Sequence, residues 1–263
     1  MIALAILFGW LLGIFINLAA DSLPGDRRLG RPQCRACGAP RPIPSWSGVV
    51  AWFTPQRDCG YCGVRLSLRE PVVELLLISA AVVLVQSSPS SVRWGVDLLA
   101  IGIMLLITVI DLEHRLILHV VSIPSALYFA AVGVLDPHVG FSRTIVGGLL
   151  AFAFFLLLYL LGAAFARWMG NRRGEEVDEV AFGFGDVMLA LVIGLAVGFP
   201  GVIGALLRGI ILAGVFSFIY LLIMSLRKRY EAFTPIPYGP FLIIGALWVY
   251  FRGDPALEVL LGY

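Results

Sequence analysis

Long apolar stretches recur along this chain of 263 residues. They are continuous and do not alternate with polar residues, and the longer ones have the 17 to 25 residues, roughly, that a helix needs to cross a bilayer. The stretches lie at 2–20, 72–87, 95–110, 117–135, 144–162, 187–199, 204–225 and 238–251. The pattern predicts an all-α polytopic membrane protein with about eight transmembrane helices, because a membrane β-barrel would show alternation.

The segment 21–70 interrupts this pattern and is rich in arginine, proline and cysteine. We therefore predict three parts: a first transmembrane helix at 1–20, a zinc-binding module at 21–70 and a seven-helix membrane core at 71–263. The composition agrees, since 60% of the residues are hydrophobic and only 14% are charged. A soluble domain of this size needs a larger share of charged residues for its surface.

Lysine and arginine are unevenly distributed among the loops. Of the 19 lysine and arginine residues, only four lie outside the loops 21–70, 111–116, 163–186 and 226–237. The positive-inside rule then predicts that these four loops face the cytoplasm and that both termini lie outside. The net charge of +2 is small, and no basic stripe is interleaved with aromatic residues, so the sequence gives no support for nucleic acid binding.

All four cysteines fall in the predicted module as two Cys-x-x-Cys pairs. Cys34 and Cys37 form the first pair, and Cys59 and Cys62 form the second. Two such turns aim four thiolates at one point, which suits a tetrahedral zinc ion with a structural role. Two disulfides, four free thiols, a redox dithiol or an iron site like that of rubredoxin would use the same residues, although a reducing cytoplasm disfavours structural disulfides.

Two aspartates lie at the same predicted depth in the membrane. Asp111 ends the third predicted span, in "IDLEHRLIL", and Asp186 begins the sixth, in "GFGD". Two neighbouring carboxyl groups cannot both ionise easily and therefore share a proton. The ionised group can activate a water while the protonated group polarises a peptide carbonyl, as in aspartic proteases. Gly183 and Gly185, which lack side chains, would let a substrate backbone approach.

Each aspartate also has a simpler interpretation. Asp is a favoured N-cap, so Asp186 could do no more than start its helix. Asp111 belongs to the charged run "DLEHR", which could be a solvated helix end, and His114 would be one more polar residue there. The residues alone leave these alternatives open.

The chain resembles the prepilin peptidases, also called type IV leader peptidases. The resemblance is carried, in order, by "GIFINLAADSLPGD", the two cysteine pairs followed by "LSLREPVVELL", "IDLEHRLIL", "GFGD" and "PIPYGPFLIIGAL". It implies an aspartic endopeptidase of the bacterial cytoplasmic membrane, with Asp111 and Asp186 as the catalytic pair and the four cysteines in a cytoplasmic zinc module. Two departures from the family pattern, Leu118-His119 and Met188, put the positioning of the substrate in question.

The resemblance also implies the substrates and partners. The expected partners are precursors of type IV pilins and pseudopilins, cut after a leader glycine on the cytoplasmic side, together with membrane lipid. Many members then methylate the new amino terminus with S-adenosylmethionine. The sequence predicts no oligomeric state. The acidic run 175–179 is either solvated or attracts the basic leader of the substrate.

Two other classes of protein compete with this interpretation. A proton-coupled transporter also carries membrane acids, but near the midplane of the bilayer rather than at its edge. A non-enzymatic assembly component of a pilus or secretion system would account for the cysteine module but not for two acids at one depth.

Overall fold

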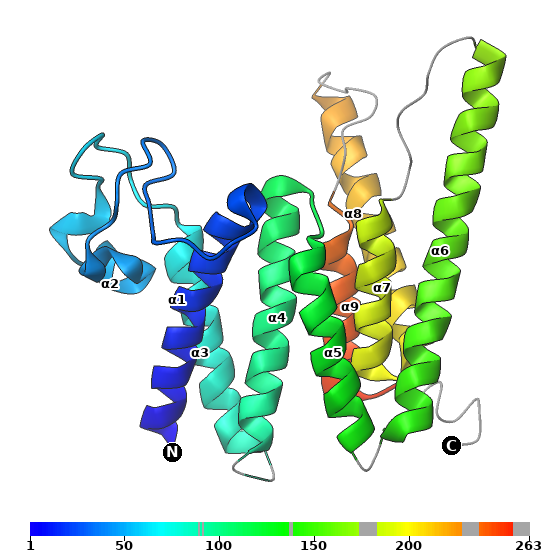
Figure 1. Cartoon of the computed structure of the whole chain (residues 1–263), viewed down its shortest axis with the longest axis horizontal. Coiled ribbons are helices and arrows are strands. Elements are labelled where there is room, and N and C mark those ends of the chain that lie inside the picture. The colour runs from blue at the N-terminus through cyan, green and yellow to red at the C-terminus, as the bar shows by residue number, and fades with distance from the viewer. Residues whose placement is uncertain (89, 91, 137–138, 174–182, 228–236, 255–263) are drawn as a thin grey trace. The chain divides into compact units, whose positions relative to one another are not determined.

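The computed structural model describes residues 1–88, 90, 92–136, 139–173, 183–227 and 237–254 (Figure 1). The described residues are mainly helical, with two isolated β-bridges in the cysteine-containing segment. Contacts divide the chain into two compact units, Met1–His114 and Arg115–Tyr263, and each is described by itself. The division into 1–20, 21–70 and 71–263 stays a prediction.

The first unit consists of three long helices and a small module inserted between the first two. The long helices are α1 (Ile2–Asp26), α3 (Arg69–Ser87) and α4 (Arg93–His114), and each packs on the other two. The module, residues 27–68, contains the short helices η1 (Ile43–Trp46), α2 (Gly48–Trp52) and η2 (Pro55–Arg57). Small residues let the long helices approach closely: a Cβ at Gly13 of α1 would lie 2.7 Å from the Cα of Glu74 in α3.

The second unit is built around α7 (Phe184–Val197). Four helices pack against α7, and most of its side chains from Val187 to Ala196 are buried. The four are α5 (His119–Leu135), α6 (Gly140–Arg173), α8 (Gly201–Leu226) and α9 (Gly239–Arg252). The helix that begins with "GFGD" is therefore the centre of this unit.

A glycine contact holds α6 and α7 together. A Cβ at Gly194 of α7 would meet the carbonyl oxygen of Gly147 in α6 and lie 2.8 Å from the Cα of Gly148. Backbone atoms cannot move aside as a flexible side chain can. Gly194→Ala is therefore expected to lower the free energy of unfolding by about 1–3 kcal/mol, measured by thermal unfolding in detergent.

Gly214 of α8 is the matched control, because nothing lies within 4 Å of a Cβ built there. Gly214→Ala should leave the unfolding temperature unchanged or raise it, since alanine is the better helix former. Equal losses of stability in both variants would contradict the importance of the α6–α7 contact.

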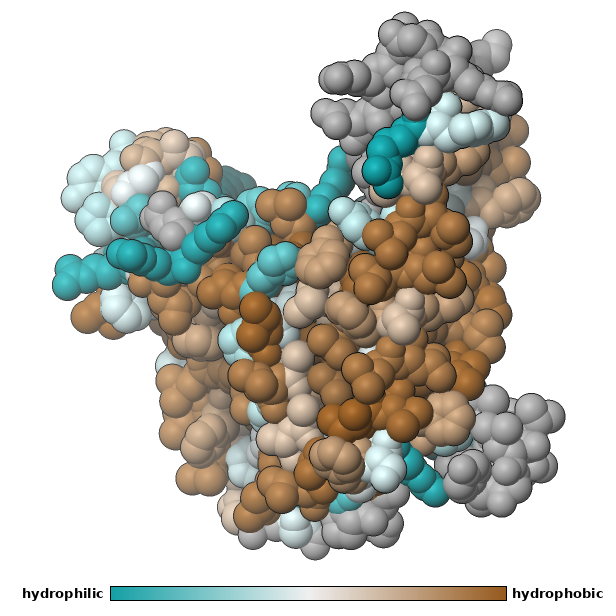
Figure 2. All heavy atoms as spheres, turned by 45° about the vertical axis from the view of Figure 1, so that its right-hand side comes forward, coloured by the Kyte–Doolittle hydropathy of each residue, from teal (hydrophilic) through white to brown (hydrophobic). Residues whose placement is uncertain are grey.

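The exposed surface of the long helices is largely apolar. Within the described part of the chain, five helices are long and apolar enough to cross a membrane, namely α1, α3, α4, α6 and α8, and the shorter α5, α7 and α9 are apolar as well. In α6 and α8 only 17% and 11% of the most hydrophobic window is buried. Figure 2 shows hydrophobic side chains along the sides of the helices and hydrophilic ones near their ends. Lipid-facing helices have this distribution, which confirms the predicted all-α membrane fold.

Candidate metal centre and candidate catalytic aspartates

The two cysteine pairs form two turns of the same local structure. In the first turn, the amide of Gly38 donates to the carbonyl of Cys34 at 2.9 Å; in the second, Gly63 donates to Cys59 at 2.8 Å. Both glycines have a φ of +70°, a conformation that glycine adopts without the steric cost of a side chain. The spacing Cys-x-x-Cys-Gly therefore folds the chain into two equivalent knuckles.

The knuckles bring the four thiols together at the spacing of a metal site. All four Sγ atoms lie within 4.8 Å of one another. The Sγ atoms of Cys34 and Cys62 are 3.6 Å apart, and those of Cys37 and Cys59 are 3.8 Å apart. Four sulfurs at about 2.3 Å from a zinc ion would be about 3.8 Å from one another in a tetrahedron. All four cysteines are free of disulfides, so this donor set fits a tetrahedral metal ion.

The backbone of the first knuckle favours a thiolate. Hydrogen bonds from the amides of Cys37 and Ala36 lower the pKa of Cys34 to about 6. Backbone amides, here those of Tyr61 and Cys62, also lower the pKa of Cys59. Because metals bind the thiolate and not the thiol, these amides favour the metal-binding form of Cys34 and Cys59. Desolvation and the neighbouring thiols instead raise the pKa of Cys62 to about 12.

A buried carboxylate anchors the module to α3. Glu74 is fully buried and accepts hydrogen bonds from Ser47 Oγ at 2.5 Å and from the Gly48 amide at 2.5 Å. The amide of Val49 and the indole of Trp10 also donate to it, both at 3.2 Å. The N-terminus of α2 thus rests on a negative charge in α3, which satisfies its free amides and suits the helix dipole.

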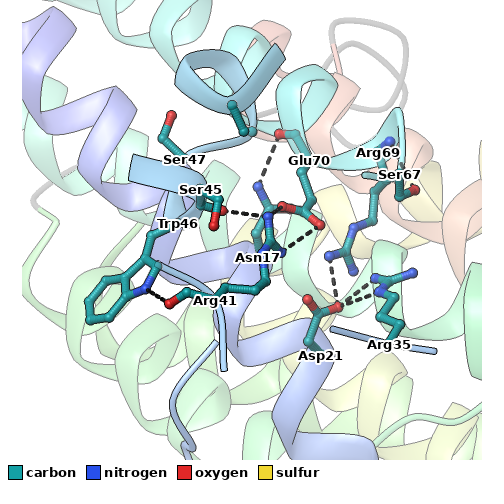
Figure 3. A network of polar contacts seen from close by, with 12 residues as sticks. Asn17, Asp21, Arg35, Arg41, Ser45, Trp46, Ser47, Ser67, Arg69 and Glu70 are labelled. Atoms are coloured by element: carbon teal, nitrogen blue, oxygen red, sulfur yellow. Dashed lines mark hydrogen bonds and ion pairs between the residues drawn. The ribbon is translucent and has the colours of Figure 1, made fainter. Parts of the chain in front are cut away.

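A second anchor joins the module to the start of α3. The guanidinium of Arg41 donates to both oxygens of Glu70, at 3.1 and 3.0 Å, and also to the carbonyl of Ser45 (Figure 3). The carbonyl of Glu70 accepts a bond from the side chain of Asn17 in α1 at 3.0 Å. The side chains of Arg41 and Glu70 are only 12% and 3% exposed, so this bidentate pair is shielded from solvent.

A third anchor is a ring of four charges. Arg35, in the first knuckle, and Arg69, at the start of α3, each donate to Asp21 of α1 and to Glu113 of α4. Figure 3 shows both arginines directed at Asp21. The cytoplasmic side predicted for the module is therefore also the side on which α4 ends.

Asp111 lies in the last turn of α4 and is buried, with 6% of its surface exposed. The three residues that follow it, Leu112, Glu113 and His114, are exposed. The charged run "DLEHR" is thus a solvated helix end only after its first residue, which weakens the simpler interpretation of Asp111.

Asp186 lies in the first turn of α7, three residues after the N-cap Gly183. Its Oδ2 accepts the amide of Gly183 at 3.1 Å. The aspartate therefore does not occupy the N-cap itself, but it does satisfy one of the free amides of the helix start. One carboxylate oxygen has this structural role, and among the described residues no hydrogen bond to Oδ1 is seen.

Residues from α5, α6 and α9 surround the start of α7. The ring of Phe184 packs edge-on against His119 of α5, with centroids 5.6 Å apart, and against Tyr159 of α6 at 6.0 Å. A Cβ at Gly185 would lie 2.8 Å from the Cβ of Ile117, so this glycine allows close packing within the protein. The helix α9 also packs against α7, and Tyr238, the N-cap of α9, is partly buried.

Sequence reasoning predicted one cluster of four cysteines, which the structure contains, but it missed the neighbours of the cysteines and of Asp186. The catalytic role of Asp111 and Asp186 stays a prediction. His119 was noted only as a departure from a family pattern, yet its ring contacts the residue two before Asp186. Arg35 carried one available signal, because it stands between two metal-ligand candidates in "CRAC". The acidic run 175–179 lies outside the described residues. Asp111 belongs to the first unit and Asp186 to the second, so the pairing of their carboxyl groups stays a prediction.

Two family models match the chain on either side of residue 90. The model described as the type IV leader peptidase family matches residues 98–218, which include both aspartates. The model described as the bacterial peptidase A24 N-terminal domain matches residues 7–87, which include all four cysteines.

Curated relatives match nearly the whole chain at low identity. A prepilin leader peptidase/N-methyltransferase of Bacillus subtilis is 23% identical over 98% of this chain and 97% of its own. A protein of the same name from Aeromonas salmonicida is 25% identical over 96% of this chain and 91% of its own length. Another, from Aeromonas hydrophila, is 27% identical over 89% of this chain and 76% of its own length. No solved structure matches the chain.

Proposed function

Because the chain belongs to the type IV leader peptidase family, we propose that it is an integral membrane aspartic endopeptidase that removes the leader of type IV prepilins and pseudopilins and then methylates the new amino terminus. The observation that carries the proposal is the pair of acidic residues at helix ends. Asp111 is buried at the end of α4, and Asp186 lies in the first turn of α7, the central helix of its unit.

We assign the two aspartates complementary roles. One carboxylate removes a proton from water, and the other, protonated, donates a hydrogen bond to the scissile carbonyl oxygen. Water adds to the carbonyl carbon, and the proton shared by the pair then passes to the leaving nitrogen. The Gly183 amide fixes the orientation of Asp186. A Cβ at Gly183 would lie 3.8 Å from Oδ2 of Asp186, an ordinary van der Waals distance, so a substrate backbone passing Gly183 would lie beside this carboxylate.

The metal proposed for the four cysteines is zinc. The spacing of the sulfurs fits tetrahedral coordination, and four protein ligands leave no open position for a substrate. Cys34, Cys37, Cys59 and Cys62 would hold the ion, and its role would be to fold the module.

The proposed methyl donor is S-adenosylmethionine, which would supply an electrophilic methyl group. The module contains a cavity of about 730 Å³ lined by residues of both knuckles, a volume in the range of small-molecule sites. Arg57 lines this cavity, with its guanidinium carbon 3.5 Å from the centre of the Trp52 ring. A cavity with a cationic lining suits the carboxylate that S-adenosylmethionine carries.

The proposed orientation places the module and both aspartates on the cytoplasmic side of a bacterial inner membrane, with both termini outside. The charge bias of the loops supports it. So does the contact of Arg35 with Glu113, because it locates the module and the end of α4 on one side.

Cleavage of a full-length prepilin by the purified protein in liposomes tests the function. We expect a product cut after the leader glycine, identified by mass spectrometry, and a further 14 Da, roughly, when S-adenosylmethionine is added. An intact prepilin would favour the transporter or assembly role. Cleavage without the added mass would restrict the protein to the peptidase activity.

A further inference from the structure

We propose that Arg35 is a positioning residue that couples the metal centre to the end of α4 and thereby to Asp111. The proposal rests on the proposed peptidase function, in which Asp111 is catalytic. It goes beyond that function by giving the cysteine module a part in peptide cleavage, through a side chain that is neither a metal ligand nor a catalytic acid.

The metal centre fixes the backbone of Arg35. This residue stands between Cys34 and Cys37, and the knuckle is closed by the hydrogen bonds of Cys34 to Ala39, at 2.8 Å, and of Gly38 to Cys34. With both cysteines bound to one ion, the backbone between them has no freedom to turn. The direction in which the Arg35 side chain leaves the knuckle is then set by the metal.

The guanidinium of Arg35 joins this knuckle to two helices. It contacts both oxygens of Glu113, Nη1 to Oε1 at 3.2 Å and Nη2 to Oε2 at 3.1 Å. Its Nε and Nη2 also donate to Oδ1 of Asp21, at 3.0 and 2.5 Å. Such a planar, multiple contact fixes an orientation, which a single surface ion pair does not.

Arg69 completes the ring from the other side. It donates to Oε2 of Glu113 at 3.1 Å and to Oδ1 of Asp21 at 2.8 Å. The side chains of Arg69, Asp21 and Glu113 are 11%, 21% and 25% exposed, and that of Arg35 is 42% exposed. Solvent therefore screens three of the four charges less than it screens those of an isolated surface pair, and Arg35 is the most exposed member of the ring. Glu113 is held by two cations at once.

The anchoring of Glu113 by Arg35 and Arg69 reaches Asp111 through the last turn of α4. Asp111 and Glu113 are two residues apart in that turn, and the helix ends at His114. Final turns of helices fray unless side chains hold them. Because a displacement of about 1 Å in a reacting group can lower a rate by about 100-fold, an anchor on Glu113 bears directly on catalysis.

Arg65 provides a matched control in the same module. It follows the second knuckle and pairs with Asp58 at 3.7 Å, with 75% and 55% of the two side chains exposed. The Arg65–Asp58 pair thus lies within the module, where Asp58 follows η2, and among the described residues no ion pair joins it to α1, α3 or α4. Arg65→Ala removes the same charge as Arg35→Ala without touching the ring.

The first test is the turnover of a full-length prepilin by Arg35→Ala, Arg35→Lys and Arg65→Ala, each with the metal present and after its removal with a chelator. For Arg35→Ala we expect kcat to fall by about 10- to 100-fold with KM unchanged. Removal of the metal from this variant should then lower kcat only slightly further. Arg35→Lys, which keeps the charge but cannot bridge both carboxylates, should recover part of the rate. Two results would overturn the proposal. One is that the losses of kcat caused by Arg35→Ala and by metal removal multiply, and the other is that Arg65→Ala lowers kcat as much as Arg35→Ala does.

The second test does not depend on activity. Hydrogen exchange of the amides at 108–114 should speed up in Arg35→Ala and in the metal-free wild type, while 96–102 in the same helix stays unchanged. Unaltered exchange at 108–114 would overturn the coupling, whatever Asp111 does. Faster exchange combined with a fully active Asp111→Asn would instead keep the coupling and refute the catalytic role of Asp111.

Discussion

Asp111→Asn and Asp186→Asn are each expected to lower the rate of prepilin cleavage by about 10²- to 10⁴-fold, the range that a positioned acid or base contributes. Asparagine keeps the size of the side chain, and its carbonyl at position 186 can still accept the Gly183 amide. The start of α7 should therefore survive while the shared proton is lost. The measurement is the initial rate in liposomes, with the product identified by mass spectrometry.

Asp97→Asn is the control for a buried aspartate in the same helix as Asp111. Asp97 is 6% exposed and pairs with Arg93, at the opposite end of α4. We expect this variant to cleave at close to the wild-type rate even if its stability falls. Near wild-type cleavage by Asp111→Asn or Asp186→Asn would instead reduce that aspartate to a helix-end residue.

Replacing one metal ligand is expected to have the second large effect. Cys34→Ser should reduce bound zinc from about one ion per chain to almost none, because three thiolates no longer close the tetrahedron. A loop of this polarity has little apolar core, so the module, residues 27–68, should become rapidly cleavable by protease. Metal content by mass spectrometry and limited proteolysis measure the two effects.

Tyr61→Phe is the matched control, since Tyr61 lies between the ligands Cys59 and Cys62 and is itself 79% exposed. Its zinc content and protease resistance should equal those of the wild type. Iron in the purified wild type would replace zinc as the assigned ion. If the purified wild type contained no metal and still resisted protease, the module would fold without a metal ion.

The positions of the helices could be predicted because apolar length is a strong signal. Each of the eight predicted spans overlaps one of the helices α1 and α3 to α9, but their ends differ. The span predicted at 144–162 is part of α6, which runs to Arg173, because "GAAFARWMGNRR" remains helical after the apolar stretch ends. The sixth span begins at Phe184, three residues earlier than predicted, since Gly183 provides the N-cap.

The metal-site residues could be predicted because their geometry is local. Two knuckles of five residues contain the ligands and the glycines that turn the chain. The ring of Arg35, Asp21, Arg69 and Glu113 could not be predicted, since the contact of Arg35 with Glu113 joins residues 78 apart in sequence. Gly185 shows a different limit: a missing side chain indicates that something approaches, here Ile117, but does not identify it.

The locality of the two knuckles has a consequence for the order in which the protein is made. Every ligand and every knuckle hydrogen bond lies between Cys34 and Val64, and α3 begins only at Arg69. During translation the cluster can therefore close while α1 is the only helix already available for insertion. The carboxylates of Glu70 and Glu74 then emerge from the ribosome to meet Arg41 and the start of α2 in a module that is already folded.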